Sequence, residues 1–144
     1  MNMQEITDRF EIADVLHRYS RGVDTRDWAL WRSVFTDDAT IDYTSTPFGK
    51  AGSRDEIADW LEESFAFVTV SQHFITNIEY DFDGDRAAVR AMFYNPMQFV
   101  GMSELSTCGG TYHHSMVRTG TGWKSERLVE ESLWFVNVPG AEES

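Results

Sequence analysis

The first part of the chain carries apolar residues at helical spacing. They recur every three or four positions, at Ile12, Leu16, Tyr19 and Val23. This period is that of one face of an α-helix, so we expect a first helix over residues 6–23. Thr7 is the expected cap at its start.

Three shorter elements follow before the pattern changes. The tryptophans in residues 27–35 lie on one side of a predicted short second helix, and Asp27 is its expected cap. Apolar and polar residues alternate over residues 39–43, which predicts a strand. Ser53-Arg54-Asp55-Glu56 matches a capping box, in which the Ser and Glu side chains bond free backbone N–H groups. We therefore expect a third helix behind Ser53. Its apolar face comprises Ile57, Trp60, Leu61 and Phe65.

From Thr69 onward the apolar period is two. Alternating runs flank Asp83-Gly84-Asp85 and again Gly120-Thr121-Gly122, which predicts antiparallel hairpins over 74–99 and 105–136. Pro96 has no N–H group to pair, so we expect a bulge or an edge position there. Helices followed by long antiparallel strands predict an α+β fold, with helices on one face of a bent sheet and a concave apolar cavity.

Composition limits the functions to consider. A length of 144 residues fits one domain, 1–144, and the net charge of -12 would repel nucleic acid and anionic membranes. Acidic pairs such as Glu130-Glu131 are expected on solvated faces. The single cysteine, Cys108, excludes a disulfide framework and a Cys-rich zinc site, and we expect it buried rather than nucleophilic. Without a long apolar run or a signal-like start, the expected location is the cytoplasm.

Histidines are the first candidates for chemistry. His113 and His114 are adjacent in a predicted strand, so they point to opposite faces and at most one faces a cavity. No His-x-His or His-x3-His spacing supports a metal site, and we expect neither metal nor other cofactor. His73 enters a strand from an apolar stretch, where a structural role is the commoner one. Asp24 follows the first helix, and because Asp27 is the better cap, Asp24 is free for another role.

Four stretches carry a resemblance to a known family. They are Gly22-Val-Asp-Thr-Arg-Asp-Trp, Ile41-Asp-Tyr, Gln72-His-Phe-Ile-Thr-Asn, and Gly109-Gly-Thr-Tyr through Gly122-Trp-Lys. In this order they resemble the SnoaL-like branch of the nuclear-transport-factor-2-like superfamily. Within that branch the chain resembles scytalone dehydratase, hexachlorocyclohexane dehydrochlorinase and bile-acid dehydratase. The resemblance implies a cone in which a curved, mixed, mostly antiparallel sheet wraps around helices and encloses a cavity.

The resemblance also implies a catalytic Asp–His dyad, which falls on Asp24 and His73. A histidine ordinarily titrates at about pH 6.5, so a neutral imidazole can take a proton near neutral pH. A buried carboxylate fixes the ring tautomer and stabilises the imidazolium that forms. The leading hypothesis is a cofactor-independent lyase or isomerase, dehydratase-like, that abstracts a proton from a cyclic apolar small molecule.

Further substrate-binding positions follow from the resemblance and from strand parity. The resemblance points to Tyr19, Tyr43 and Arg118, and Met97 stands where one relative has a second pocket histidine. Parity then places Tyr112 and His114 on the face of Arg118 and turns His113 away. If His114 faces the cavity, it could act as the acid in place of that second histidine, which this chain lacks at Met97.

Two other functions remain open from the sequence. One is a non-catalytic ligand-binding or assembly domain, such as the small subunit of a ring-hydroxylating oxygenase. The other is a polyketide cyclase, which would use an acidic base and need little from His73. In each case we expect a homo-oligomer, a dimer or a trimer, formed through the convex sheet face with Phe93 or Val117 turned outward.

Overall fold

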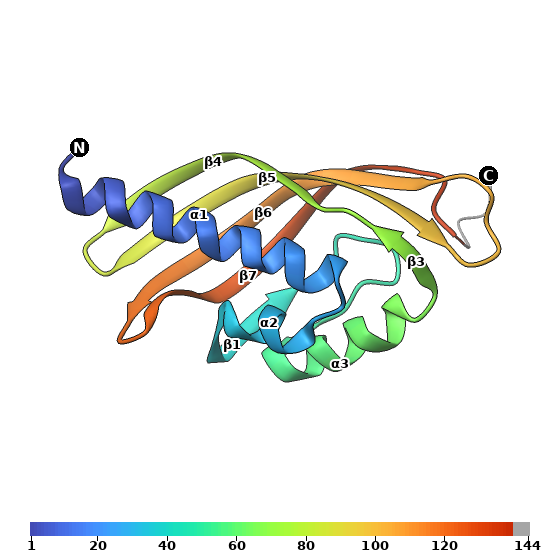
Figure 1. The fold of residues 1–144 in the computed structure, drawn as a ribbon, viewed down its shortest axis with the longest axis horizontal. Helices are drawn as coiled ribbons and strands as arrows, with labels where there is room; N and C mark the ends of the chain where they lie inside the picture. The colour runs from blue at the N-terminus through green and yellow to red at the C-terminus, as the bar shows by residue number, and fades with distance from the viewer. Residues whose placement is uncertain (140–144) are drawn as a thin grey trace.

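A curved sheet with helices packed along one of its faces makes up the fold (Figure 1). The computed structural model describes residues 1–139. The elements are α1 (Met3–Asp24), α2 (Trp28–Ser33), β1 (Phe35–Asp42), β2 (Ala51–Ser53), α3 (Arg54–Phe65), β3 (Val68–Ser71), β4 (Phe74–Asp83), β5 (Arg86–Phe99), β6 (Ser106–Thr119) and β7 (Gly122–Val136). Within the described part of the chain, no helix has the length and apolar character needed to span a membrane.

The sheet is mixed and mostly antiparallel, which confirms the predicted fold class. Its order is β2-β1-β7-β6-β5-β3, with β4 also paired to β5. Only the β1–β7 contact is parallel among the described pairs. The β6–β7 register shifts between Gly109 and Gly110 and between Ser115 and Met116, and such bulges bend a sheet. The sheet therefore curls around α1.

Both predicted hairpins are confirmed. Asp83 pairs with Arg86 across the first turn, and Thr119 pairs with Gly122 across the second. Gly84 has a φ of 61°, in the left-handed region that glycine adopts without steric cost. The Asp-Gly signal in the sequence therefore marks this turn correctly.

The predicted start of the first helix is wrong, whereas the caps of the other two helices are confirmed. The helix begins at Met3, because the Asn2 side chain accepts the N–H of Glu5 at 2.9 Å. Thr7 lies inside it. Asp27 caps α2 by accepting the N–H of Leu30 at 3.0 Å, and Ser53 caps α3.

The second helix is shorter than predicted and the first strand is longer. Helix α2 ends at Ser33, and β1 begins at Phe35 rather than at residue 39. Phe35 pairs with Ser125 of β7, and the Ser125 N–H donates to the Val34 carbonyl at 2.8 Å. This parallel pairing takes the last residues of the predicted helix into the sheet.

Pro96 occupies neither a bulge nor an edge. On one side it continues the β5–β6 register opposite Thr107. On the other side it falls between the end of the β4 pairing at Tyr94 and the start of the β3 pairing at Met97. A residue without an N–H fits this gap because no strand there needs the bond. The gap is also where the chain turns between β3 and β4.

The core lies between α1, α2 and the concave face of the sheet. Its largest fully buried side chain is Trp31, whose ring centroid is 4.7 Å from that of Phe35 and 6.5 Å from that of Tyr19. Gly22 allows the close approach of the two helices, because a Cβ there would lie 2.8 Å from the Trp31 backbone nitrogen. This contact sets the position of α1 two residues before Asp24.

The prediction that Phe93 is turned outward on the convex face is wrong. That residue is buried on the concave side, where its ring stacks on Tyr112 with centroids 4.2 Å apart. Val117 is half-buried. An exposed aromatic row of Phe74, Tyr94 and Trp134 occupies the convex side instead.

Candidate active site

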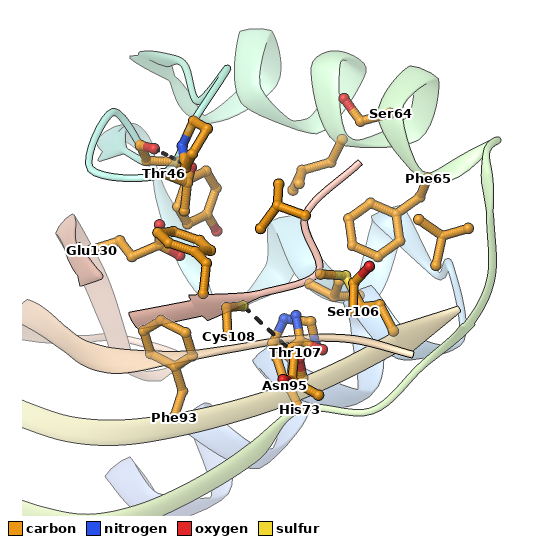
Figure 2. Close-up of a pocket in the computed structure, with 18 of the residues that line it drawn as sticks. Thr46, Ser64, Phe65, His73, Phe93, Asn95, Ser106, Thr107, Cys108 and Glu130 are labelled. Atoms are coloured by element: carbon orange, nitrogen blue, oxygen red, sulfur yellow. Dashed lines mark hydrogen bonds between the residues drawn. The ribbon is translucent and has the colours of Figure 1, made fainter. Parts of the chain in front are cut away.

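A cavity of about 210 Å³ opens where α3 meets the ends of β5, β6 and β7 (Figure 2). Most of its walls are aliphatic or aromatic side chains, among them Val23, Trp60, Leu61, Phe65, Phe93, Met97, Phe99 and Phe135. For scale, an engineered apolar cavity of about 150 Å³ in another protein holds benzene. The space therefore suits a small ring compound.

Asp24 and His73 are in direct contact at this cavity. The Oδ1 atom of Asp24 lies 2.6 Å from His73 Nδ1, and Asp24 Oδ2 accepts the backbone N–H of His73 at 2.7 Å. The His73 side chain is 6% exposed and that of Asp24 is 19% exposed. Because a carboxylate only accepts, Nδ1 carries the proton of the neutral ring and Nε2 keeps its lone pair.

The break between β3 and β4 explains why His73 can be held in this way. Gln72 donates its N–H to the carbonyl of Pro96 at 3.1 Å, and the chain then leaves the edge of β5. The N–H of His73 has no strand partner, so it turns to Asp24. Arg26, just after α1, donates to the carbonyl of Val68 in β3 and ties the helix end to the same corner.

Two polar residues that the sequence did not single out support the pair. The Ser71 hydroxyl donates to Asp24 Oδ1 at 3.1 Å. The amide oxygen of Asn95, which lines the cavity, lies 3.3 Å from the same hydroxyl. Both side chains are buried, so on this side the carboxylate of Asp24 faces polar groups of the protein.

The structure places Tyr19, Tyr43 and Tyr112 together at the cavity wall. The hydroxyls of Tyr19 and Tyr43 are hydrogen-bonded to each other, and the ring of Tyr112 meets that of Tyr19 edge-on at 5.3 Å. Burial raises the pKa of all three phenols well above the usual value, so each stays neutral. They can offer hydrogen bonds to a ligand but no charge.

Met97 and Cys108 also line the cavity. Cys108 is buried, as expected, and its thiol lies 3.9 Å from the Asn95 carbonyl oxygen. Burial, with a smaller contribution from the charge of Glu130, raises the pKa of the thiol to about 12. Cys108 is therefore a neutral wall residue and not a nucleophile.

His114 lies in the core and not at the cavity. Its Nδ1 donates to Ser125 Oγ at 2.9 Å, because the Ser125 hydroxyl itself donates to the Arg127 carbonyl at 3.0 Å. Burial, with some repulsion from His113, lowers the pKa of His114 to about 3. Because His114 lies outside the cavity and its ring stays neutral, the structure does not support the binding and acid roles predicted for it.

Arg118 is also far from the cavity, which corrects its predicted binding role. It forms two bonds with Asp8 of α1, at 2.7 and 2.9 Å, and a third with Asp85 at 2.8 Å. The guanidinium holds the pKa of the Asp8 carboxyl at about 2. Strand parity correctly placed Arg118 on the same face as Tyr112. The two residues are six positions apart along the strand, or about 20 Å, so Arg118 does not reach the cavity.

Glu130 is a charged cavity residue that the sequence analysis missed. It faces inward from β7, while its neighbour Glu131 is exposed and pairs with His113 at 3.0 Å on the convex side. The expectation that both glutamates lie on a solvated face is therefore wrong for Glu130. Within residues 1–139, no group of three or more potential metal-ligating side chains comes together.

Comparison with known proteins matches the sequence of this chain to a family. The sequence pattern of the SnoaL-like domain matches residues 4–129. An uncharacterized protein of Mycobacterium tuberculosis is 37% identical over 131 residues, which cover 90% of this chain and 88% of that protein.

Solved structures share the fold. A candidate scytalone dehydratase of Novosphingobium aromaticivorans superposes with a TM-score of 0.86 at 20% identity, over 99% of this chain and 100% of that one. A type 3 hexachlorocyclohexane dehydrochlorinase of Novosphingobium barchaimii superposes with a TM-score of 0.80 at 19% identity, over 100% and 99%. At these identities the likeness shows a common fold.

Proposed function

The chain belongs to the SnoaL-like domain family, and we propose that it is a cofactor-independent lyase or isomerase in which His73 removes a proton from a small, largely apolar ring compound. The observation that carries the proposal is the 2.6 Å contact between Asp24 Oδ1 and His73 Nδ1 at the cavity. The names of the two structural relatives, a dehydratase and a dehydrochlorinase, both denote eliminations.

The roles of the two residues follow from their atoms. With Nδ1–H bonded to Asp24, the lone pair of Nε2 is the free basic site of His73. When Nε2 takes a proton from carbon, the carboxylate of Asp24 stabilises the positive charge that appears on the ring. The second bond, from the backbone N–H of His73 to Asp24 Oδ2, fixes the carboxylate against the main chain of His73 and so keeps Oδ1 within reach of Nδ1.

The walls add to this by excluding water. A base surrounded by Val23, Phe65 and Met97 acts on a C–H group without competition from bulk solvent. The electron pair released from the C–H bond then forms a double bond as a leaving group departs. In an isomerisation the pair shifts instead to another carbon, which takes the proton back from His73.

We expect Asp24→Asn to lower kcat/KM for a general-base probe by about 10- to 100-fold, because the imidazolium loses its counter-charge. The probe is 5-nitrobenzisoxazole, a fused two-ring compound. Removal of the proton on the carbon of its isoxazole ring breaks the N–O bond and releases a coloured phenolate, which is followed by absorbance.

The matched control is Glu131→Gln, which alters the exposed His113–Glu131 pair in the same chemical way. Its rate should equal that of the wild-type protein. Equal rates for Asp24→Asn and wild type, or a wild-type rate no higher than that of free imidazole, would contradict the proposal.

A further inference from the structure

Glu130 lies in the same cavity as His73 but on a different wall. It projects from β7 directly across from Tyr112 of β6, whereas His73 enters from the turn between β3 and β4 (Figure 2). The residue is 8% exposed. Its Oε1 accepts one bond, from Ser132 Oγ at 3.3 Å. Among residues 1–139, no Lys, Arg or His lies within ion-pair distance of it.

The ionisable groups around Glu130 disfavour its charge. Five acidic groups interact electrostatically with Glu130. They are Asp42 from β1, Tyr19 from α1, Tyr43 after β1, and Tyr112 and Cys108 from β6. One is an anion and four are neutral acids. Burial raises the pKa of Glu130 from its ordinary 4.5 to about 7. Hydrogen bonds from the Ser132 and Ser45 hydroxyls oppose this rise in part, and the charge of Asp42 adds a smaller increase. The carboxyl is therefore largely protonated below about pH 7 and about half protonated at that pH.

The neighbouring phenols extend this donor surface. Tyr19 and Tyr43 share one hydrogen bond between their hydroxyls, so one of the two protons remains free to be donated. Glu130, Tyr19 and Tyr43 thus present neutral donors on one part of the wall, while His73 presents an acceptor on another. A substrate between them meets a base and an acid at once.

Resting on the proposed function, we propose that Glu130 is the catalytic acid of this site and donates its proton to an oxygen that leaves the substrate. His73 Nε2 takes the proton from one carbon, and the C–H electron pair forms the new C=C bond. The C–O bond of the neighbouring carbon breaks with its pair on oxygen. That oxygen takes the proton of Glu130 and departs as water, after which the proton on His73 returns to Glu130 through solvent.

This assignment selects the substrate class. A hydroxyl group leaves poorly as hydroxide and gains most from a proton, whereas a halide leaves as an anion and needs none. The donors on the wall carry no positive charge to stabilise a departing anion. The expected substrate is therefore a neutral ring compound that carries a hydroxyl group next to an acidic C–H.

Leaving-group dependence tests the acid separately from the base. The probes are 5-nitrobenzisoxazole, 5-chlorobenzisoxazole and unsubstituted benzisoxazole, in which the oxygen becomes a progressively poorer leaving group. Glu130→Gln is expected to slow the unsubstituted probe by about 100-fold and the nitro probe by less than about tenfold. His73→Ala should slow all three by similar factors. Glu131→Gln is the matched control and should change none.

The outcomes separate the two proposals. If His73→Ala slows every probe but Glu130→Gln slows all three equally or none, the base proposal stands and the acid assignment is overturned. If His73→Ala has no effect, the proposed function fails instead. The pH profile adds a readout that a structural role would not give. With unsubstituted benzisoxazole, the wild-type rate should fall as pH rises through about 7. The rate of Glu130→Gln should show no such decrease.

A measurement without any substrate checks the protonation itself. Because the pKa of Glu130 is higher in the folded than in the unfolded chain, its contribution to stability is present at low pH. That contribution is lost as pH rises from about 4 to about 7. The Tm of Glu130→Gln relative to wild type should therefore increase over this range, with Glu131→Gln showing no such increase. A constant Tm difference would overturn the assignment.

Discussion

The His73→Ala variant is expected to eliminate 5-nitrobenzisoxazole at least about 100-fold more slowly than the wild-type protein, because a positioned general base contributes about 10²- to 10⁴-fold. Alanine leaves the cavity walls and Asp24 in place but removes Nε2. The effect should fall on kcat more than on KM, since the apolar walls that bind the probe are unchanged. Absorbance of the released phenolate gives both constants.

His113→Ala is the control for that result. It removes another histidine that pairs with a carboxylate, at 3.0 Å, but on the convex face. Its rate and KM should match those of the wild-type protein. A His73→Ala variant that keeps full activity would remove His73 from the mechanism and leave the cyclase-like alternative, in which an acidic residue acts alone.

Trp31→Ala is expected to cost about 3–5 kcal/mol of unfolding free energy, as truncation of a buried tryptophan usually does. The side chain is 0% exposed and fills the space between Phe35 and Tyr19. That cost is a large share of the roughly 5–15 kcal/mol by which domains are stable. Thermal unfolding should show a Tm lower by about 10 °C or more.

Trp134→Ala is the matched truncation at the surface. That ring is 40% exposed on the convex face, so its removal leaves little unfilled volume and should cost about 1 kcal/mol. Similar Tm losses in the two variants would contradict the position of Trp31 at the centre of the core. A well-folded Trp31→Ala protein should also show weakened activity, because Trp31 packs against Gly22, two residues before Asp24.

Local patterns predicted the elements of this fold well. The Asp83-Gly84-Asp85 turn and the caps at Asp27 and Ser53 depend on neighbouring residues, and each lies where expected. The end of α2 was missed because Phe35 is taken into the sheet by pairing with Ser125, ninety positions away. Such long-range pairing has no signal in a short window of sequence.

The candidate site was predicted in part. Resemblance brought Asp24 and His73 together, and the structure places them in contact. Parity placed Arg118 on the right face but could not say how far along the strand the cavity reaches. The same parity argument, applied to Glu130 and Glu131, would have turned one of the two glutamates inward.

Ser71 and Asn95 carried no such signal. They come from β3 and β5, and the contacts of Ser71 with Asn95 and with Asp24 arise only when the chain leaves the edge of β5 near Pro96. A serine in a short strand and an asparagine in a long one are ordinary residues until the topology is known. The surroundings of the dyad are therefore a property of the fold rather than of any motif.

The proposed function requires that Asp24 hold His73 with Nδ1 protonated and Nε2 free to act as a base. Nitrogen-15 NMR of the histidine side chains tests it most directly, with the His73 signals assigned by their absence in His73→Ala. At a pH where the ring is neutral, the proposal predicts a protonated Nδ1 and an unprotonated Nε2 for His73, and a shift away from this tautomer in Asp24→Asn. A His73 ring protonated at Nε2, or a tautomer unaffected by Asp24→Asn, would contradict it.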